Sequence, residues 1–192
     1  TELPETMTRA HYTFLGWYTA KTGGQRVLQS TTVGSYEDHT LYARWQGDQV
    51  SVIYEYEGAT GNNTTVSGKA TYGSTFGTLV TPTRTGYTFG GWWTAPNGGG
   101  TRIQAGTTVT QTEDFKVYAK WTANEYTVTF DGNDGGTNTA QVATASKQVT
   151  YDGSYGTLPE PTRAGYIFQG WAVGNSFGSA VVTESTKMTT AK

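Results

Sequence analysis

Cysteine is absent from this 192-residue chain, which excludes structural disulfides and thiolate metal sites. An excess of one charge is also missing, because 13 Lys and Arg residues against 15 Asp and Glu residues give a net charge of -2. Without a basic stripe to neutralise phosphates, we expect no nucleic-acid partner. No apolar run is long enough to cross a bilayer, so we expect no membrane span within these residues.

Helical periodicity is also missing, since no long stretch repeats its apolar residues every 3.6 positions. Glycine is abundant instead, with 26 residues, and the aromatic content reaches 14%. This composition is typical of strands joined by turns. Apolar and polar residues alternate around Val50, Val52 and Tyr54, which indicates a half-buried strand. We therefore predict a mainly β fold with little or no helix.

An aromatic signature that ends in tryptophan occurs three times, at residues 11–17, 86–93 and 165–171. A second signature, Tyr-Ala-x-Trp, follows the first two copies at residues 42–45 and 118–121. The resulting period of about 75–79 residues is longer than that of common solenoid modules. A unit of this size can hold its own small core. The chain is therefore predicted to be a tandem array of independent domains.

The copies predict three segments with different degrees of completeness. Residues 1–46 match the C-terminal part of a first repeat, residues 47–122 form a complete second repeat, and residues 123–192 form a third repeat without its closing strand. A partial repeat leaves an unpaired sheet edge and half a core. We expect the incomplete segments to pair with each other, with a neighbouring chain or with an appended segment, so self-association is one expected partnership.

Two linked motifs carry a family resemblance. Residues 82–92 read Pro-Thr-Arg-Thr-Gly-Tyr-Thr-Phe-Gly-Gly-Trp, and residues 117–121 read Val-Tyr-Ala-Lys-Trp. Residues 161–171 repeat the first motif, and a degraded copy of both motifs begins at residue 8. This pattern resembles the Listeria-Bacteroides repeat, also called the internalin B-repeat family. The sequence departs from it at His11, where the motif has glycine, and at residues 55–58, where Asn-Gly-Gly would stand.

The resemblance implies small β-grasp-like domains strung in arrays on bacterial surface or secreted proteins, with no catalytic residues to carry over. The recurring aromatic residues are then predicted to form a core signature in each repeat. These residues are Tyr12, Phe14, Trp17, Tyr42, Trp45, Tyr87, Phe89, Trp92, Tyr118, Trp121, Tyr166, Phe168 and Trp171. Their recurrence and large apolar area favour packing over ligand binding.

Trp93 differs from these residues because adjacent residues of a strand point to opposite faces. If Trp92 faces the core, Trp93 faces outward. Trp93 and its counterpart Tyr18 are therefore candidate contacts for a ligand or a partner. Exposed aromatic rings can stack on sugars, so a carbohydrate-binding module is an alternative interpretation.

Neither catalytic nor metal-binding residues are expected. Residues 131–135 begin like a calcium loop, but no glutamate follows at the required distance, so we favour a simple turn. Acidic pairs at residues 37–38 and 113–114 precede the closing strands without any nucleophile motif. The two histidines, His11 and His39, do not recur in the other copies. We expect no cofactor and no enzyme activity.

The expected function is that of a non-catalytic extracellular repeat array in a bacterial surface or secreted protein. Such an array would act as a stalk or spacer and as a weak adhesive module. Its expected partners are a surface protein or glycan of a host or neighbouring cell. A second alternative, besides carbohydrate binding, is a subunit of an assembled surface fibre whose incomplete ends are completed by other molecules.

Overall fold

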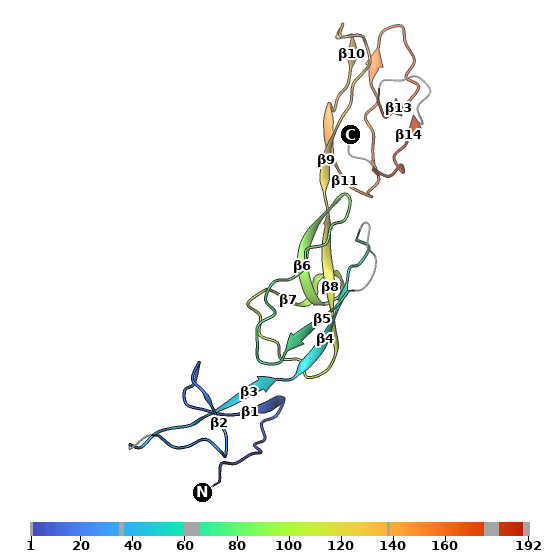
Figure 1. Ribbon diagram of the computed structural model, residues 1–192. Helices are drawn as coiled ribbons and strands as arrows, with labels where there is room; N and C mark the ends of the chain where they lie inside the picture. The colour runs from blue at the N-terminus through green and yellow to red at the C-terminus, as the bar shows by residue number, and fades with distance from the viewer. Residues whose placement is uncertain (1, 35–36, 60–65, 138, 175–180, 190–192) are drawn as a thin grey trace. The chain divides into compact units, whose positions relative to one another are not determined.

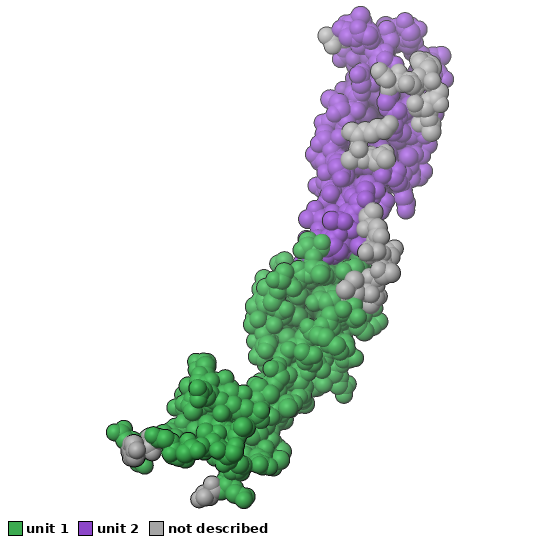
Figure 2. Space-filling model, in the orientation of Figure 1, with its two compact units in different colours: residues 1–57, 62–81, 91–120 green, residues 58–61, 82–90, 121–192 purple. Residues whose placement is uncertain are grey.

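The computed structural model describes residues 2–34, 37–59, 66–137, 139–174 and 181–189. The chain divides into two compact units, which are coloured separately in Figure 2. Unit 1 contains residues 1–57, 62–81 and 91–120. Unit 2 contains residues 58–61, 82–90 and 121–192.

The first sheet is small and antiparallel, and it lies within unit 1. Its strands are β1 (Tyr12–Tyr18), β2 (Arg26–Val27) and β3 (Tyr42–Gly47), in the order β2-β1-β3. A bulge shifts the register between Phe14 and Gly16, so that Phe14 faces Trp45 and Trp17 faces Ala43. Gly16 permits this bulge because its φ of 116° lies in a region that L side chains rarely adopt.

A five-stranded sheet follows, and Figure 1 shows its strands in cyan to yellow. Its order is β5-β4-β8-β6-β7. β4 pairs antiparallel with β5 and parallel with β8, so the first and last strands of the predicted second repeat meet at the centre. The strands are β4 (Gln49–Glu55), β5 (Val66–Thr71), β6 (Tyr87–Ala95), β7 (Gly99–Ile103) and β8 (Phe115–Ala123).

The core of this sheet follows the alternation of the sequence. Val50 and Val52 are buried on β4, and Val117 and Ala119 are buried on β8. Trp92 on β6 is also buried, with 1% of its surface exposed, and its ring meets that of Tyr54 on β4. A two-residue period therefore brings side chains from several strands to one face.

The third part of the chain forms shorter pairs within unit 2. Three two-stranded sheets are described there, β11-β9, β10-β12 and β13-β14. Phe130, Val149, Val182 and Met188 are buried. The strands are β9 (Glu125–Thr129), β10 (Ala140–Gln141), β11 (Ser146–Thr150), β12 (Thr162–Arg163), β13 (Trp171–Ala172) and β14 (Val181–Val182).

The same loop hydrogen bonds occur in both units. In unit 1, the N–H of Gly73 donates to the carbonyl of Val109 over 2.9 Å. In unit 2, the N–H of Asp152 donates to the carbonyl of Met188 over 2.8 Å. The two bonds have the sequence spacing that separates Trp92 from Trp171. The repeat in the sequence is therefore matched by a repeat in the backbone hydrogen bonds.

The predicted mainly β fold is confirmed. The helix found among the described residues is a single 3-10 turn at Pro96–Gly98. None of the helical structure in that part of the chain has the length and hydropathy needed to cross a membrane. The strand order is compatible with a β-grasp-like domain but does not test that expectation, and the predicted repeat boundaries also stay predictions.

Candidate functional site

The tryptophan that ends each aromatic signature is held by one backbone hydrogen bond. Its indole N–H donates to a carbonyl in the segment that precedes the signature. The acceptors are Pro4 for Trp17 at 2.9 Å, Val80 for Trp92 at 2.8 Å and Pro159 for Trp171 at 2.7 Å. Trp92 is buried, whereas Trp17 and Trp171 are half-buried. A polar atom with a partner lets a large ring pack inward.

The aromatic contacts recur between copies as well. Phe14 meets Trp45 at 5.2 Å between ring centroids, and Phe89 meets Trp121 at 5.4 Å, both with planes tilted by 56°. The remaining members of the predicted core signature differ in exposure. Tyr12, Tyr42, Tyr87 and Tyr118 are half-buried, as are Phe14, Phe89, Trp45 and Trp121, whereas Tyr166 and Phe168 are exposed.

Trp93 and Tyr18, the two candidate contact residues, are both half-buried. Each has a cation over its ring. The Lys120 ammonium lies 5.1 Å from the centroid of Trp93, and the Arg44 guanidinium carbon lies 4.0 Å from that of Tyr18. Lys120 and Arg44 occupy equivalent places before the closing tryptophan. One face of each ring is therefore occupied by a cation–π contact.

The acidic loop at residues 131–135 is a turn held by its own carboxylates. Asp131 accepts a hydrogen bond from the N–H of Asn133 over 2.8 Å. Asp134 accepts from Ala140 over 2.9 Å and from Gly136 over 3.0 Å. The Ala140 bond above all lowers the pKa of Asp134. No metal-binding cluster of three His, Cys, Asp or Glu residues is found in the part of the chain that the structure describes.

Of the two acidic pairs, the second joins two strands. The Asp114 carboxylate accepts a hydrogen bond from the Ser51 N–H over 2.6 Å, and this bond lowers the pKa of Asp114. Lys69 donates to the Ser51 hydroxyl over 3.0 Å. Asp114 therefore fixes the start of β8 beside β4, which is a structural role. In the first pair, the Glu37 carbonyl lies 3.2 Å from Nδ1 of His39.

We expect the Asp114 contact to disappear at low pH. Because the folded-state pKa is lowered, the carboxylate stabilises the fold above its unfolded pKa of about 3.9 and stops doing so as the pH falls through the folded value. Asp114→Asn should therefore lower the melting temperature at pH 7, and the difference from wild type should shrink in acid. Glu113→Gln removes the same charge one residue away and is the control. An Asp114→Asn effect that persists below pH 2 would contradict this role.

One contact between two tyrosines forms at each of the two places where one repeat leads into the next. The sequence analysis did not identify these contacts. Asp48 alone separates β3 from β4, and Asn124 alone separates β8 from β9. We call the two places the tyrosine joints. The first joint consists of His11, Tyr12, Asp48 and Tyr72, and the second consists of Gly86, Tyr87, Asn124 and Tyr151.

The backbone of each linking residue is hydrogen-bonded on both sides. In the first joint, the Asp48 N–H donates to His11 over 3.0 Å and its carbonyl accepts from Tyr72 over 2.9 Å. In the second joint, the Asn124 N–H donates to Gly86 over 2.9 Å and its carbonyl accepts from Tyr151 over 2.8 Å. The linking residue is thus held by the copy before it and by the copy after it.

Aromatic rings meet edge to face in each joint. Tyr12 and Tyr72 lie 5.5 Å apart at 80°, and Tyr87 and Tyr151 lie 5.7 Å apart at 76°. Arginine stacks on the first tyrosine of each pair, with Arg9 over Tyr12 and Arg84 over Tyr87.

One hydrogen bond and one substitution distinguish the joints. The Tyr87 hydroxyl donates to Asp152 over 2.8 Å, which raises the pKa of Tyr87. His11 replaces the motif glycine, yet its φ of 63° is left-handed like the φ of 77° at Gly86. The first turn therefore keeps the backbone conformation of the second. The recurrence of Tyr72 and Tyr151 is the sequence signal for these joints.

The similarity of this chain to known proteins is divided in the same way, with one match for each repeat. Residues 1–44, 51–120 and 126–192 match the sequence profile of the Listeria-Bacteroides repeat domain. Internalin H of Listeria monocytogenes is 35% identical over 122 residues, which cover 64% of this chain and 21% of that protein. Two proteins of Evansella cellulosilytica described as membrane proteins, the second of them Gly-rich, are also similar. The first is 33% identical over 135 residues and the second 30% identical over 161 residues.

The two Evansella alignments cover 70% and 82% of this chain, but only 19% and 17% of those proteins. The chain therefore spans about a fifth of the length of the curated relatives that it matches. The profile matches, in contrast, account for most of the chain, and they fall where the aromatic signatures recur. On this ground the chain belongs to the Listeria-Bacteroides repeat family.

Proposed function

We propose that these residues are a non-catalytic spacer in a bacterial surface or secreted protein, holding other parts of that protein at a set reach. The observation that carries this proposal is the tyrosine joint. A single linking residue with both backbone groups hydrogen-bonded has little of the freedom of a Gly/Ser-rich linker. Because the two joints have the same construction, we expect them to position successive repeats in the same way. Repeats joined in series in this way would act as a spacer, unlike repeats joined by flexible linkers.

An extracellular location is supported by the relatives. Internalin H and two proteins described as membrane proteins carry similar repeats. A weak adhesive role would follow from repetition, because several low-affinity contacts on one molecule gain strength through effective concentration. Loops and exposed side chains would make such contacts with a surface protein or glycan of another cell.

The spacer proposal predicts a narrow distance distribution across the second joint. The chain has no cysteine, so Thr110→Cys and Ser146→Cys would accept two unique spin labels, one in each unit. Both positions are exposed. We expect pulsed electron paramagnetic resonance to give one narrow peak. Insertion of Gly-Ser-Gly-Ser after Asn124 should broaden it, since four flexible residues add about 10–12 Å of root-mean-square reach.

A matched control tests whether the ring contact contributes. Tyr87→Phe keeps the ring against Tyr151 and removes the hydroxyl bond to Asp152, whereas Tyr87→Ala removes both. We expect a broader peak for Tyr87→Ala than for Tyr87→Phe. A wild-type distribution as broad as that of the insertion variant would refute the spacer.

Carbohydrate binding stays the alternative, based on Trp93 and Tyr18. The cations that cover one face of each ring do not favour it. A glycan array in which a bound sugar is lost on Trp93→Ala would support this alternative over the spacer.

A further inference from the structure

An arginine faces an outward aromatic residue across two neighbouring strands in the first repeat and again in the second. Tyr18 of β1 faces Arg26 of β2, and Trp93 of β6 faces Arg102 of β7. Both arginines are exposed. In the part of the chain that the structure describes, no ion pair or hydrogen bond is found for either guanidinium. Each side chain therefore presents a full charge and several N–H donors to solvent.

A glycine on the aromatic strand makes room for each guanidinium. A Cβ added to Gly16 would lie 2.8 Å from Nε of Arg26, and a Cβ added to Gly91 would lie 2.7 Å from Nε of Arg102. Each guanidinium therefore lies against the backbone of the neighbouring strand, where a larger residue would displace it. A donor that is already held in place loses less conformational entropy when it binds a ligand.

In the first repeat, the closing strand extends this pair into a row of side chains. Tyr18 faces Tyr42 of β3, and Arg44 of the same strand lies over the Tyr18 ring at 4.0 Å. Arg44 also donates to the carbonyl of Ala20 over 3.1 Å, so it adds charge to the row but has fewer free donors. The ammonium of Lys21 lies 5.9 Å from the Tyr42 ring. Aromatic rings thus hold two more cations near the exposed arginine.

The second repeat has a row of the same construction. Lys120 of β8 lies 5.1 Å from the Trp93 ring. β8 and β6 are neighbours, and the Phe–Trp contact between β1 and β3 recurs between them, which places Tyr118 beside Trp93. On the other side, Glu55 of β4 faces Tyr118 and is paired with Lys116 over 2.8 Å. The charge of Glu55 is therefore balanced, and the row keeps an excess of positive charge.

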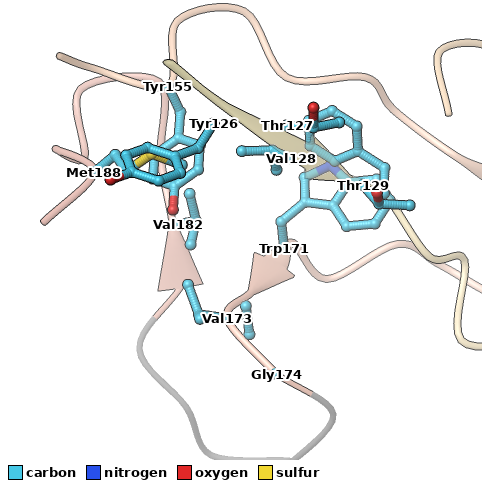
Figure 3. A pocket seen from close by; sticks show the side chains of 12 residues that line it. Tyr126, Thr127, Val128, Thr129, Tyr155, Trp171, Val173, Gly174, Val182 and Met188 are labelled. Atoms are coloured by element: carbon cyan, nitrogen blue, oxygen red, sulfur yellow. The ribbon is translucent and has the colours of Figure 1, made fainter. Parts of the chain in front are cut away.

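The third repeat has the strand pair without the row. Figure 3 shows Trp171 of β13 near Val128 of β9, and the next residue, Ala172, takes the place of the outward aromatic residue. Val181 of β14 faces Ala172 and takes the place of the arginine. β13 and β14 therefore pair without an aromatic residue or an arginine at these positions. The row is not needed to join the two strands, which favours a role in binding.

We propose that each of these rows binds a carboxylate group of an acidic polysaccharide, with the exposed arginine as the main contact. A planar guanidinium donates two parallel hydrogen bonds to a carboxylate, which gives both affinity and geometric selectivity. The cation held over the ring adds attraction for the same anion. We call these sites the cationic rows. They consist of Tyr18, Lys21, Arg26, Tyr42 and Arg44 in the first repeat, and of Trp93, Arg102, Tyr118 and Lys120 in the second.

A polymer is the ligand because the row recurs in successive repeats, and a polymer that repeats its charged sugar supplies the same group to both. Two weak contacts on one chain then gain strength through effective concentration. The chain as a whole has a net charge of -2, so the attraction comes from the rows and not from the overall charge. This inference rests on the proposed function, since it names a partner class for the weak adhesive role. It differs from sugar stacking on Trp93, because the arginine and not the ring makes the main contact.

The test titrates the whole chain with a galacturonate trisaccharide, followed by NMR. We expect saturable binding of two trisaccharides per chain, with amide shifts in β1, β2, β6 and β7 and none in β13 and β14. The methyl ester of the same trisaccharide keeps the sugar rings and loses the charge. It should bind at least about tenfold more weakly. Equal binding of acid and ester, or no binding at millimolar concentration, would overturn the sites.

Chain variants provide the matched set. Arg102→Gln should weaken binding at the second row at least about tenfold and leave the shifts in β1 and β2, whereas Arg26→Gln should do the reverse. Both side chains are exposed, so the melting temperature should stay unchanged. Lys187→Gln removes the same charge from an exposed position outside the rows and should leave both sites intact. An equal loss for Lys187→Gln and Arg102→Gln would mean attraction by general charge and would overturn the sites.

Two further measurements separate this inference from its neighbours. Sulfated dextran and single-stranded DNA of similar length carry negative charge without sugar carboxylates, and binding as tight as that of the trisaccharide would overturn the choice of ligand. The spin-label distance between positions 110 and 146 reports the spacer independently. A narrow distribution without trisaccharide binding would overturn the cationic rows and support the spacer. A broad distribution with binding would refute the spacer and support the rows.

Discussion

Trp92→Ala is expected to lower the free energy of unfolding of unit 1 by about 3–5 kcal/mol, the usual range for truncating a large aromatic residue in a core. The indole is 1% exposed, and its rings meet Tyr54 at 4.9 Å and Tyr56 at 5.6 Å. Truncation would also leave the Val80 carbonyl without the indole donor. Urea unfolding followed by the amide NMR signals of unit 1 would measure the loss.

Trp171→Ala is the matched comparison, because its indole makes the same bond to Pro159. Trp171 is half-buried, so less apolar area is removed from water there and the loss should be clearly smaller. Trp92→Phe keeps a ring but removes the donor, and it should fall between wild type and Trp92→Ala. Equal losses for the two alanine variants would contradict the difference in packing.

Local patterns were enough to predict the type of structure. The alternation at Val50, Val52 and Tyr54 marks β4, because a two-residue period directly records which face of a strand is buried. The recurring Tyr-Ala-x-Trp motif lies on β3 and β8. The parallel pairing of β4 with β8 could not be predicted in the same way, since it joins residues about 60 positions apart and depends on the whole sheet.

The tyrosine joints show the same limit for the candidate site. Tyr12, Tyr87 and Tyr166 are recognisable as copies, and so are Tyr72 and Tyr151. That one set packs on the other is a non-local contact that recurrence does not reveal. Recurrence also does not predict burial, since Tyr166 is 65% exposed with Arg163 over its ring. For Trp93, the alternation rule predicted that the side chain faces away from the side of Trp92. It could not predict that Lys120 lies over the ring.

Gly86→Ala is expected to disrupt the second tyrosine joint, with a loss of about 2–5 kcal/mol in the free energy of unfolding of unit 2. Two effects add. The φ of 77° is left-handed, which costs a residue with a Cβ about 1–2 kcal/mol. The added Cβ would also overlap the ring of Tyr151, which must move away from Tyr87. Thermal unfolding of unit 2, followed by its amide NMR signals, would measure the loss.

Gly165→Ala separates the two effects, because Gly165 is the same motif position in the third copy. Its φ of 80° matches that of Gly86, but an added Cβ would meet nothing within 4 Å. Only the backbone strain of about 1–2 kcal/mol should remain. The difference between the two variants then reports the contact with Tyr151, and spin labels at positions 110 and 146 should show a broader distribution for Gly86→Ala alone. If both variants lose the same stability and leave the distribution unchanged, the Tyr151 ring does not hold the joint together.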